Sequence, residues 1–204
     1  MKFLNKKYSA FFALITFVLI LLISSCTSET GVPKPRTYPR VEFPKKEYQK
    51  FESKSCGFSF EYPVYSIIVN DKTYFNSKAP NDCWHNIIFK DFNGTLFLTY
   101  YPVNKKQDLD KYINESYELV SMHDIKATGR KEKVIKEKNK GGILFKIEGN
   151  VATETQFFLT DSSKNFIRGS LYFNNKVNPD SMAIIQKFID QDIENLISTF
   201  KWTK

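Results

Sequence analysis

The sequence predicts an α+β fold for residues 52–204, in which a mostly antiparallel sheet of about six or seven strands is covered by two helices. Several segments alternate apolar and polar residues with the two-residue period of a strand, for example at Phe58, Phe60 and Tyr62. Two other segments carry apolar residues at helical spacing. Aromatic residues make up 16% of the chain, and their rings can fill the space between a helix layer and a sheet.

The expected strands follow one another along the chain and are separated by turn residues. They span Phe58–Tyr62, Tyr65–Val69, Ile87–Phe92, Thr95–Tyr101, Ile143–Ile147, Val151–Thr160 and Asn165–Phe173. Asn93-Gly94 predicts a two-residue hairpin turn, because both residues tolerate positive φ. Gly149-Asn150 and Asp161-Ser162-Ser163-Lys164 predict the two turns of a meander formed by the last three strands.

A charged stretch, Arg130–Lys140, precedes this meander. It contains five lysines and one arginine against Glu132 and Glu137, arranged around Val134 and Ile135. This pattern favours a solvated outer strand, because lysines on an edge strand discourage pairing between sheets. A binding patch for a partner is the alternative interpretation.

Two helices complete the predicted fold. The first runs from Asp108 to about Val120, with Asp108 as the capping residue. Its buried face carries Leu109, Tyr112, Ile113 and Ser116. The second opens at Asn178-Pro179-Asp180-Ser181, where a proline and a capping side chain suit a helix start. Its apolar stripe must be buried against the sheet, and consists of Ile185, Phe188, Ile189, Ile193, Leu196, Ile197 and Phe200.

The N-terminus has the order of a secretory signal: positive, then apolar, then small residues. Lysines at positions 2, 6 and 7 precede the apolar run Ala10–Ile23, which ends at Ser24, Ser25 and Cys26. A helix over this run is about 21 Å long, shorter than the hydrocarbon core of about 30 Å. We therefore predict that residues 1–25 are a removed signal peptide and that Cys26 carries the lipid.

Lipidation at Cys26 predicts the location of the protein. Two or three acyl chains anchor a protein durably, since each buried CH₂ contributes about 0.8 kcal/mol. We expect a domain tethered to a membrane of the cell envelope and facing the periplasm. The sequence leaves open whether this is the inner or the outer membrane.

Residues 26–51 are predicted to form a basic, proline-rich tether. Its four prolines exclude regular helix and favour an extended chain. The tether is either a spacer or a segment that docks on a partner or on the domain itself. Tyr38, Val41 and Phe43 favour docking, because a spacer needs no apolar anchors. The predicted partner-binding residues are Pro33, Lys34, Pro35, Arg36 and Tyr38.

Charge and cysteine content restrict the function further. The net charge is +8, and removal of residues 1–25 takes away three lysines and leaves +5. This charge is modest and spread along the chain, so nucleic acid is not an expected partner. Cys56 and Cys83 are expected to form a disulfide in an oxidising compartment, with a metal site at Cys83 and His85 as the weaker alternative.

The sequence contains no recognisable catalytic constellation. Its two histidines, His85 and His123, have no nucleophile motif near them, and no phosphate-binding loop or metal-binding cysteine pair is present. We interpret His85 as a packed strand residue and His123 as a contact after the first helix. We therefore expect no enzyme activity, no cofactor and no metal, and keep an envelope hydrolase as a third hypothesis.

Two resemblances add to this interpretation. The opening Gly57–Pro63 and the closing Ser198–Trp202 resemble the PsbP/Mog1-like α/β/α sandwich. After Cys26, nearly the whole chain resembles the gliding-motility lipoprotein family GldD. The residues that carry this second likeness are Pro33–Arg40, Pro44–Tyr48, Phe60–Pro63, His123–Ala127, Gly149–Ala152, Gln156–Ser162 and Phe166–Phe173.

The second resemblance implies a protein of the Bacteroidota with a role in gliding motility and in the type IX secretion system tied to it. Our leading hypothesis is a non-enzymatic accessory or assembly lipoprotein that acts through contacts with other envelope proteins at the membrane. The alternative is a periplasmic ligand-binding module, in which the sandwich holds a lipid, glycan or peptide. The high aromatic content motivates this alternative.

Overall fold

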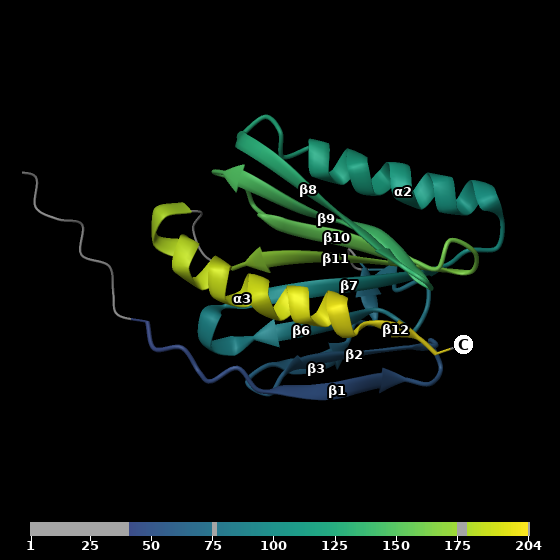
Figure 1. The fold of residues 1–204 in the computed structure, drawn as a ribbon, viewed down its shortest axis with the longest axis horizontal. Coiled ribbons are helices and arrows are strands. Elements are labelled where there is room, and N and C mark those ends of the chain that lie inside the picture. The colour runs from purple at the N-terminus through teal and green to yellow at the C-terminus, as the bar shows by residue number, and fades with distance from the viewer. Residues whose placement is uncertain (1–40, 75–76, 175–178, 204) are drawn as a thin grey trace, which may run out of the picture. The chain divides into compact units, whose positions relative to one another are not determined.

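The computed structural model describes residues 41–74, 77–174 and 179–203, within a compact unit that begins at Arg40 (Figure 1). Its helices are η1 (Lys90–Phe92), α2 (Lys106–Ser121) and α3 (Pro179–Thr199). Its strands are β1 (Tyr48–Ser53), β2 (Phe58–Pro63), β3 (Ile67–Asn70), β4 (Thr73–Tyr74), β5 (Ser77–Lys78), β6 (His85–Phe89), β7 (Gly94–Pro102), β8 (Ala127–Glu137), β9 (Lys140–Gly149), β10 (Thr155–Thr160), β11 (Asn165–Phe173) and β12 (Lys201–Trp202).

The main sheet has seven antiparallel strands in the order β3-β6-β7-β11-β10-β9-β8. The α3 helix packs on one face of this sheet and α2 on the other, as Figure 1 shows. The predicted α+β class and the predicted meander are therefore confirmed. Several strand boundaries differ by a few residues, and the largest difference is that β10 begins at Thr155 rather than at Val151, which is buried in the preceding loop.

The apolar stripe of α3 forms the centre of the larger core. Ile189, Ile193 and Leu196 are almost fully buried against the main sheet and against β2. The strand predicted at Phe58–Tyr62 is found in a separate three-stranded sheet, in the order β1-β2-β12. In this second sheet β1 pairs with β2 over six residues, and β12, which follows α3, adds the pair Trp202–Phe58 at the other edge of β2.

The predicted two-residue turn at Asn93-Gly94 is wrong. Gly94 is already the first residue of β7 and pairs with Phe89, and the connection is the short helix η1. Phe92, in η1, is 4% exposed and packs against the ring of Phe188. Burial of this ring favours the tighter helical loop, and Asn93 takes the left-handed conformation, with φ of 50°, that its side chain tolerates.

Two local predictions depend on aspartate side chains. The α2 helix begins at Lys106, slightly before the predicted start, and the Asp108 carboxylate accepts the backbone N–H of Lys105 at 2.9 Å. Asp161 accepts the backbone N–H groups of Ser163 and Lys164 at 2.9 and 2.8 Å. The turn at Asp161 is thus confirmed, whereas the capping position predicted for Asp108 is wrong: Lys105 is the N-cap residue, and Asp108 accepts its backbone N–H from within the first turn.

The charged stretch behaves as predicted over most of its length but not at its end. β8 is an edge strand of the main sheet, and its lysines are exposed. Lys140, however, is 4% exposed and caps the C-terminus of α3. Its Nζ donates to the carbonyl oxygens of Ile197 and Phe200 at 2.6 and 3.3 Å, where the helix dipole favours a cation.

The segment before β1 is fastened to α3. Lys46 Nζ lies 2.6 Å from Asp192 Oδ1 and 3.4 Å from the centre of the Phe188 ring. The hydroxyls of Tyr48 and Tyr65 donate to the same carboxylate, and burial raises the pKa of Tyr48 to about 12. Burial also lowers the pKa of Lys46. We call Lys46, Tyr48, Tyr65 and Asp192 the clamp.

Phe43 packs beside the clamp, with its ring centre 4.4 Å from that of Phe188 and 5.8 Å from that of Phe92. The docking predicted for this apolar residue is therefore observed on the domain itself. The sequence placed residues 48–51 in the tether, but they form part of β1 and belong to the compact unit. The described part of the tether is thus folded onto α3.

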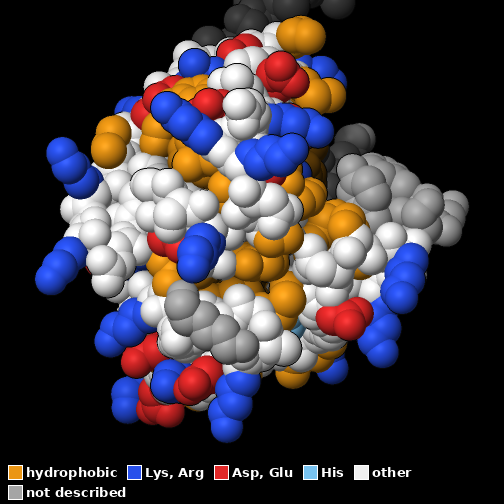
Figure 2. All heavy atoms as spheres, turned by 90° about the vertical axis from the view of Figure 1, so that its right-hand side faces the viewer, with side chains coloured by type: hydrophobic (Ala, Val, Ile, Leu, Met, Phe, Trp, Pro, Cys, Tyr) orange, Lys and Arg blue, Asp and Glu red, His pale blue; other side chains and the backbone are white. Residues whose placement is uncertain are grey.

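Basic side chains are spread over the face of the molecule that Figure 2 draws, with acidic and hydrophobic side chains between them.

Cys56 and Cys83 are joined by a disulfide, as expected. His85 lies close by in β6 and is 7% exposed. Its ring contacts those of Phe51 and Phe58 edge-on, with centres 5.0 and 6.0 Å apart. Burial lowers the pKa of His85, so the folded protein favours the neutral ring.

We predict that Lys46→Met destabilises the protein by about 2–3 kcal/mol, because it leaves the Asp192 carboxylate buried without its cation. Asp192→Asn should cost less, since the Lys46 side chain is 23% exposed and can turn to water. Urea unfolding followed by tryptophan fluorescence measures both. Lys45→Met is the control: its exposed pair with Glu47 should contribute less than about 1 kcal/mol. Equal effects at positions 45 and 46 would contradict the clamp.

We predict that His85 makes the fold sensitive to acid. In the unfolded chain its pKa returns to 6.5, so the unfolded state binds a proton that the folded state resists. Stability is therefore complete above about pH 6.5 and falls as the pH drops toward the lowered folded pKa. His85→Phe should reduce this loss between about pH 7 and pH 5 in urea titrations. Identical pH profiles of the two proteins would exclude this role.

Candidate functional site

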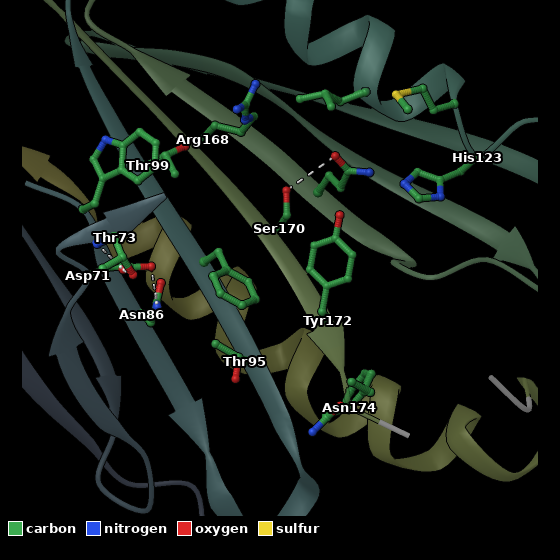
Figure 3. Close-up of a pocket in the computed structure, with 16 residues that line it drawn as sticks. Asp71, Thr73, Asn86, Thr95, Thr99, His123, Arg168, Ser170, Tyr172 and Asn174 are labelled. Carbon is green, nitrogen blue, oxygen red and sulfur yellow. Dashed lines mark hydrogen bonds between the residues drawn. The ribbon is translucent and has the colours of Figure 1, made fainter. Parts of the chain in front are cut away.

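The α2 helix covers only part of its face of the main sheet. It packs over Phe145, Phe158 and Phe166 on β9, β10 and β11. The parts of β6, β7 and β11 beyond its C-terminal end carry no helix, and a groove of about 990 Å³ opens there (Figure 3). We call this cavity the sheet groove.

Strand register determines which side chains form the floor of the sheet groove. Asn86, Phe97, Ser170 and Gln156 lie side by side on β6, β7, β11 and β10. Neighbouring rows on the same face carry the pair Thr99–Arg168 and the pair Thr95–Tyr172. Figure 3 shows Arg168, Ser170 and Tyr172 along one strand, with His123 on the far side of the cavity.

The floor contains polar atoms without partners. Gln156 is 3% exposed, and its Nε2 has no hydrogen-bond partner among the described residues. The other end of its amide lies 3.5 Å from Ser170 Oγ. Thr99 Oγ1 is also buried and unpaired within the described part of the chain. Buried polar groups are nearly always paired, so these atoms indicate a place for a bound group.

Arg168 supplies positive charge next to these atoms. It is half-buried, and its guanidinium lies 6.0 Å from the centre of the Tyr101 ring. Within the described ranges, no carboxylate forms an ion pair with it. Asp71 lines the opposite side, but its oxygens accept hydrogen bonds from Thr73 and Asn86. The sheet groove is therefore richer in free donors than in free acceptors.

The walls are aromatic and apolar. The rings of Phe97 and Tyr172 meet edge to face with centres 5.8 Å apart, and each residue is more than a third exposed. Met122, after the end of α2, is 70% exposed beside them. Burial raises the pKa of Tyr172 and lowers that of His123, so both side chains are favoured in their neutral forms.

The residues predicted from sequence do not form this site. Cys26 and the predicted contact residues Pro33, Lys34, Pro35, Arg36 and Tyr38 lie outside the described residues. Cys56 and Cys83 are joined on the other side of the sheet, in the core beneath α3. His123 lines the groove, whereas His85 is enclosed by phenylalanine rings.

One feature of the sequence could have predicted some of these groove residues. In β11, Arg168, Ser170 and Tyr172 alternate with Ile167, Gly169 and Leu171. A central strand with an arginine on one face indicates that this face is not simply core. Gly169 is required on the other face, because the Phe157 ring would lie 2.3 Å from an added Cβ.

Other kinds of site have little support in the described part of the chain. No group of three or more His, Cys, Asp or Glu residues there could hold a metal ion. Neither α2 nor α3 is long and apolar enough to cross a membrane. No hydrogen bond among the described residues joins the side chain of His85 or His123 to a serine or a carboxylate.

Two of the solved structures that match this chain are the following. Cyanobacterial PsbP from Synechocystis sp. PCC 6803 is 12% identical, with a TM-score of 0.41 over 78% of this chain and 94% of its own. The Ran-binding protein Mog1p from Saccharomyces cerevisiae is 13% identical, with a TM-score of 0.46 over 78% of this chain and 97% of its own.

Comparison with curated protein sequences finds no match. A family model described as gliding motility lipoprotein GldD matches residues 28–202. This match includes both sheets, both long helices and every residue of the sheet groove. The chain therefore belongs to the family of the gliding motility lipoprotein GldD.

Proposed function

We propose that this lipoprotein is a non-enzymatic accessory or assembly component of the gliding and type IX secretion machinery. It acts through contacts with other envelope proteins while its lipid holds it at the membrane, facing the periplasm. Membership in the family supports a membrane-anchored protein of the cell envelope with a role in gliding motility. The signal sequence ending at Cys26 supports export and lipidation.

The sheet groove is the observation that carries this proposal. A sheet face is normally covered or solvated by polar side chains, but here an apolar and donor-rich half-face is left open. Unpaired donors at Gln156 and Thr99 suit recognition of another molecule. The groove offers no base and nucleophile pair among its described side chains, which favours binding over hydrolysis.

The position of the clamp fits this role. Lys46 and Phe43 fasten the start of the domain to α3, which packs on one face of the main sheet. The sheet groove opens on the opposite face of that sheet. A partner can therefore occupy the groove without displacing the segment that leads to the anchor.

A ligand-binding module on a lipid anchor is the second candidate. The groove favours it in one respect, because Phe97, Tyr172 and Trp84 line a cavity large enough for a small lipid, glycan or peptide. The two candidates differ in what occupies the groove: a segment of a machinery protein or a free ligand.

We predict that deletion of the gene in a gliding species abolishes colony spreading and impairs secretion. Wild-type complementation should restore both. Complementation with Cys26→Ser should restore neither, because serine has no thiol to be acylated and the protein therefore leaves the membrane. Palmitate labelling and membrane fractionation of the two complemented strains measure this step. Normal spreading and secretion in the deletion strain would refute the proposed function.

We also predict that the tether contributes a contact. Lys34→Glu together with Arg36→Glu should reduce colony spreading several-fold while the unfolding transition stays unchanged, since the pair lies before the compact unit. The matched control is Lys136→Glu with Lys138→Glu, which makes the same charge change at exposed positions. Loss of spreading in the control alone would instead assign the contact to the charged edge strand.

A further inference from the structure

The polar and aromatic side chains of the sheet groove determine which chemical groups can bind there. The Gln156 amide, buried at the floor, needs an acceptor for its free N–H groups. Arg168 on β11 lies between two other polar residues: Thr99 on β7 is its cross-strand partner, and Gln156 on β10 is its diagonal neighbour, about 7–8 Å away. One group with several acceptor oxygens can therefore bind Arg168 together with Gln156.

Charge selects a carboxylate among such groups. The Arg168 guanidinium presents a planar fork of donors, which matches the two oxygens of a carboxylate. Asp71 also lines the groove, but its oxygens already accept hydrogen bonds from Thr73 and Asn86, so it does not neutralise Arg168. A single cation in a partly apolar groove favours one carboxylate over a polyanion such as nucleic acid.

The aromatic part of the groove selects an apolar group next to the carboxylate. Phe97 is opposite Ser170, which is two residues from Arg168 along β11. Two residues of strand span about 6.6–6.8 Å, which is also the spacing of side chains that point the same way from an extended peptide. An extended chain can thus place an acidic side chain at Arg168 and an apolar one at Phe97.

The geometry points to a binding site for an extended acidic segment of a partner protein, with the order acidic, any residue, apolar. The carboxylate is bound by Arg168 and Gln156, and the apolar side chain packs against Phe97 and Tyr172. This inference rests on the proposed function, because it names the chemistry of the partner that the lipoprotein recognises.

A peptide fits the groove better than an acidic glycan does. Sugars stack on the flat faces of aromatic rings, whereas Phe97 and Tyr172 meet edge to face at 75° and so do not present one flat surface. An aliphatic side chain packs against such a pair without needing a flat face. Ser170 lies between the two subsites, and its hydroxyl oxygen can accept a hydrogen bond from the peptide backbone while it donates to Gln156.

The test uses the full-length lipidated protein in detergent and a fluorescein-labelled peptide with the repeat Ser-Glu-Ser-Leu. Fluorescence polarisation should show saturable binding. Peptides with the repeat Ser-Gln-Ser-Leu or Ser-Glu-Ser-Ser should bind about tenfold more weakly, because each lacks one of the two groups. Equal binding of all three peptides, or tighter binding of an oligogalacturonate, would overturn the inference.

Variants locate the binding in the groove. Arg168→Gln and Gln156→Met should each weaken binding of the glutamate peptide about tenfold and leave the glutamine peptide almost unchanged. Lys131→Gln is the matched control, because it removes one positive charge from the opposite face of the sheet. If the melting temperature of a variant differs from that of the wild type, NMR of the wild-type protein takes the place of that variant. Upon titration with the glutamate peptide, the side-chain amide signal of Gln156 must then shift.

The outcome is separable from that of the proposed function. If the peptide fails to bind, yet the deletion strain still loses gliding, the groove inference is wrong and the role in motility stands. If Arg168→Gln weakens peptide binding as expected and also fails to restore spreading, both are supported. A deletion strain that glides normally refutes the role in motility whatever the peptide does.

Discussion

Burial of the apolar stripe of α3 is the constraint on which the rest of the structure depends. Ile189, Ile193 and Leu196 contact the main sheet and β2 together, so one helix joins two sheets that share no hydrogen bonds. At about 25 cal/mol per Å² of apolar surface, a stripe of large residues dominates the stability of such a layer. Lys140 then fixes the end of the helix by binding its last carbonyl groups, far from any neighbour in sequence.

The two faces of the main sheet have different roles because of this packing. On the face that α3 covers, side chains pack so closely that a Cβ at position 169 would clash with the Phe157 ring, and only glycine fits there. On the other face α2 is shorter than the sheet is wide, and the uncovered half carries Arg168 and Gln156. Stability and recognition are thus assigned to opposite faces of the same strands.

The clamp connects the fold to the membrane anchor. A buried carboxylate such as Asp192 is costly unless it is paired, and its partners are Lys46 before β1, Tyr48 at the start of β1 and Tyr65 after β2. The first described residues are consequently part of the core layer rather than a free linker.

The sequence by itself determined the class of the fold, the meander, both long helices, the expected lipid attachment at Cys26 and the pairing of Cys56 with Cys83. These depend on local periodicity, on capping residues and on short motifs, all of which are visible along the chain. Only the tertiary structure decided the second sheet, the burial of Lys140 and Asp192, and the groove around Arg168. Each of these depends on residues distant in sequence. A charge is tolerated inside a protein only when packing brings a partner to it, and a sheet face stays open only when no other element packs on it.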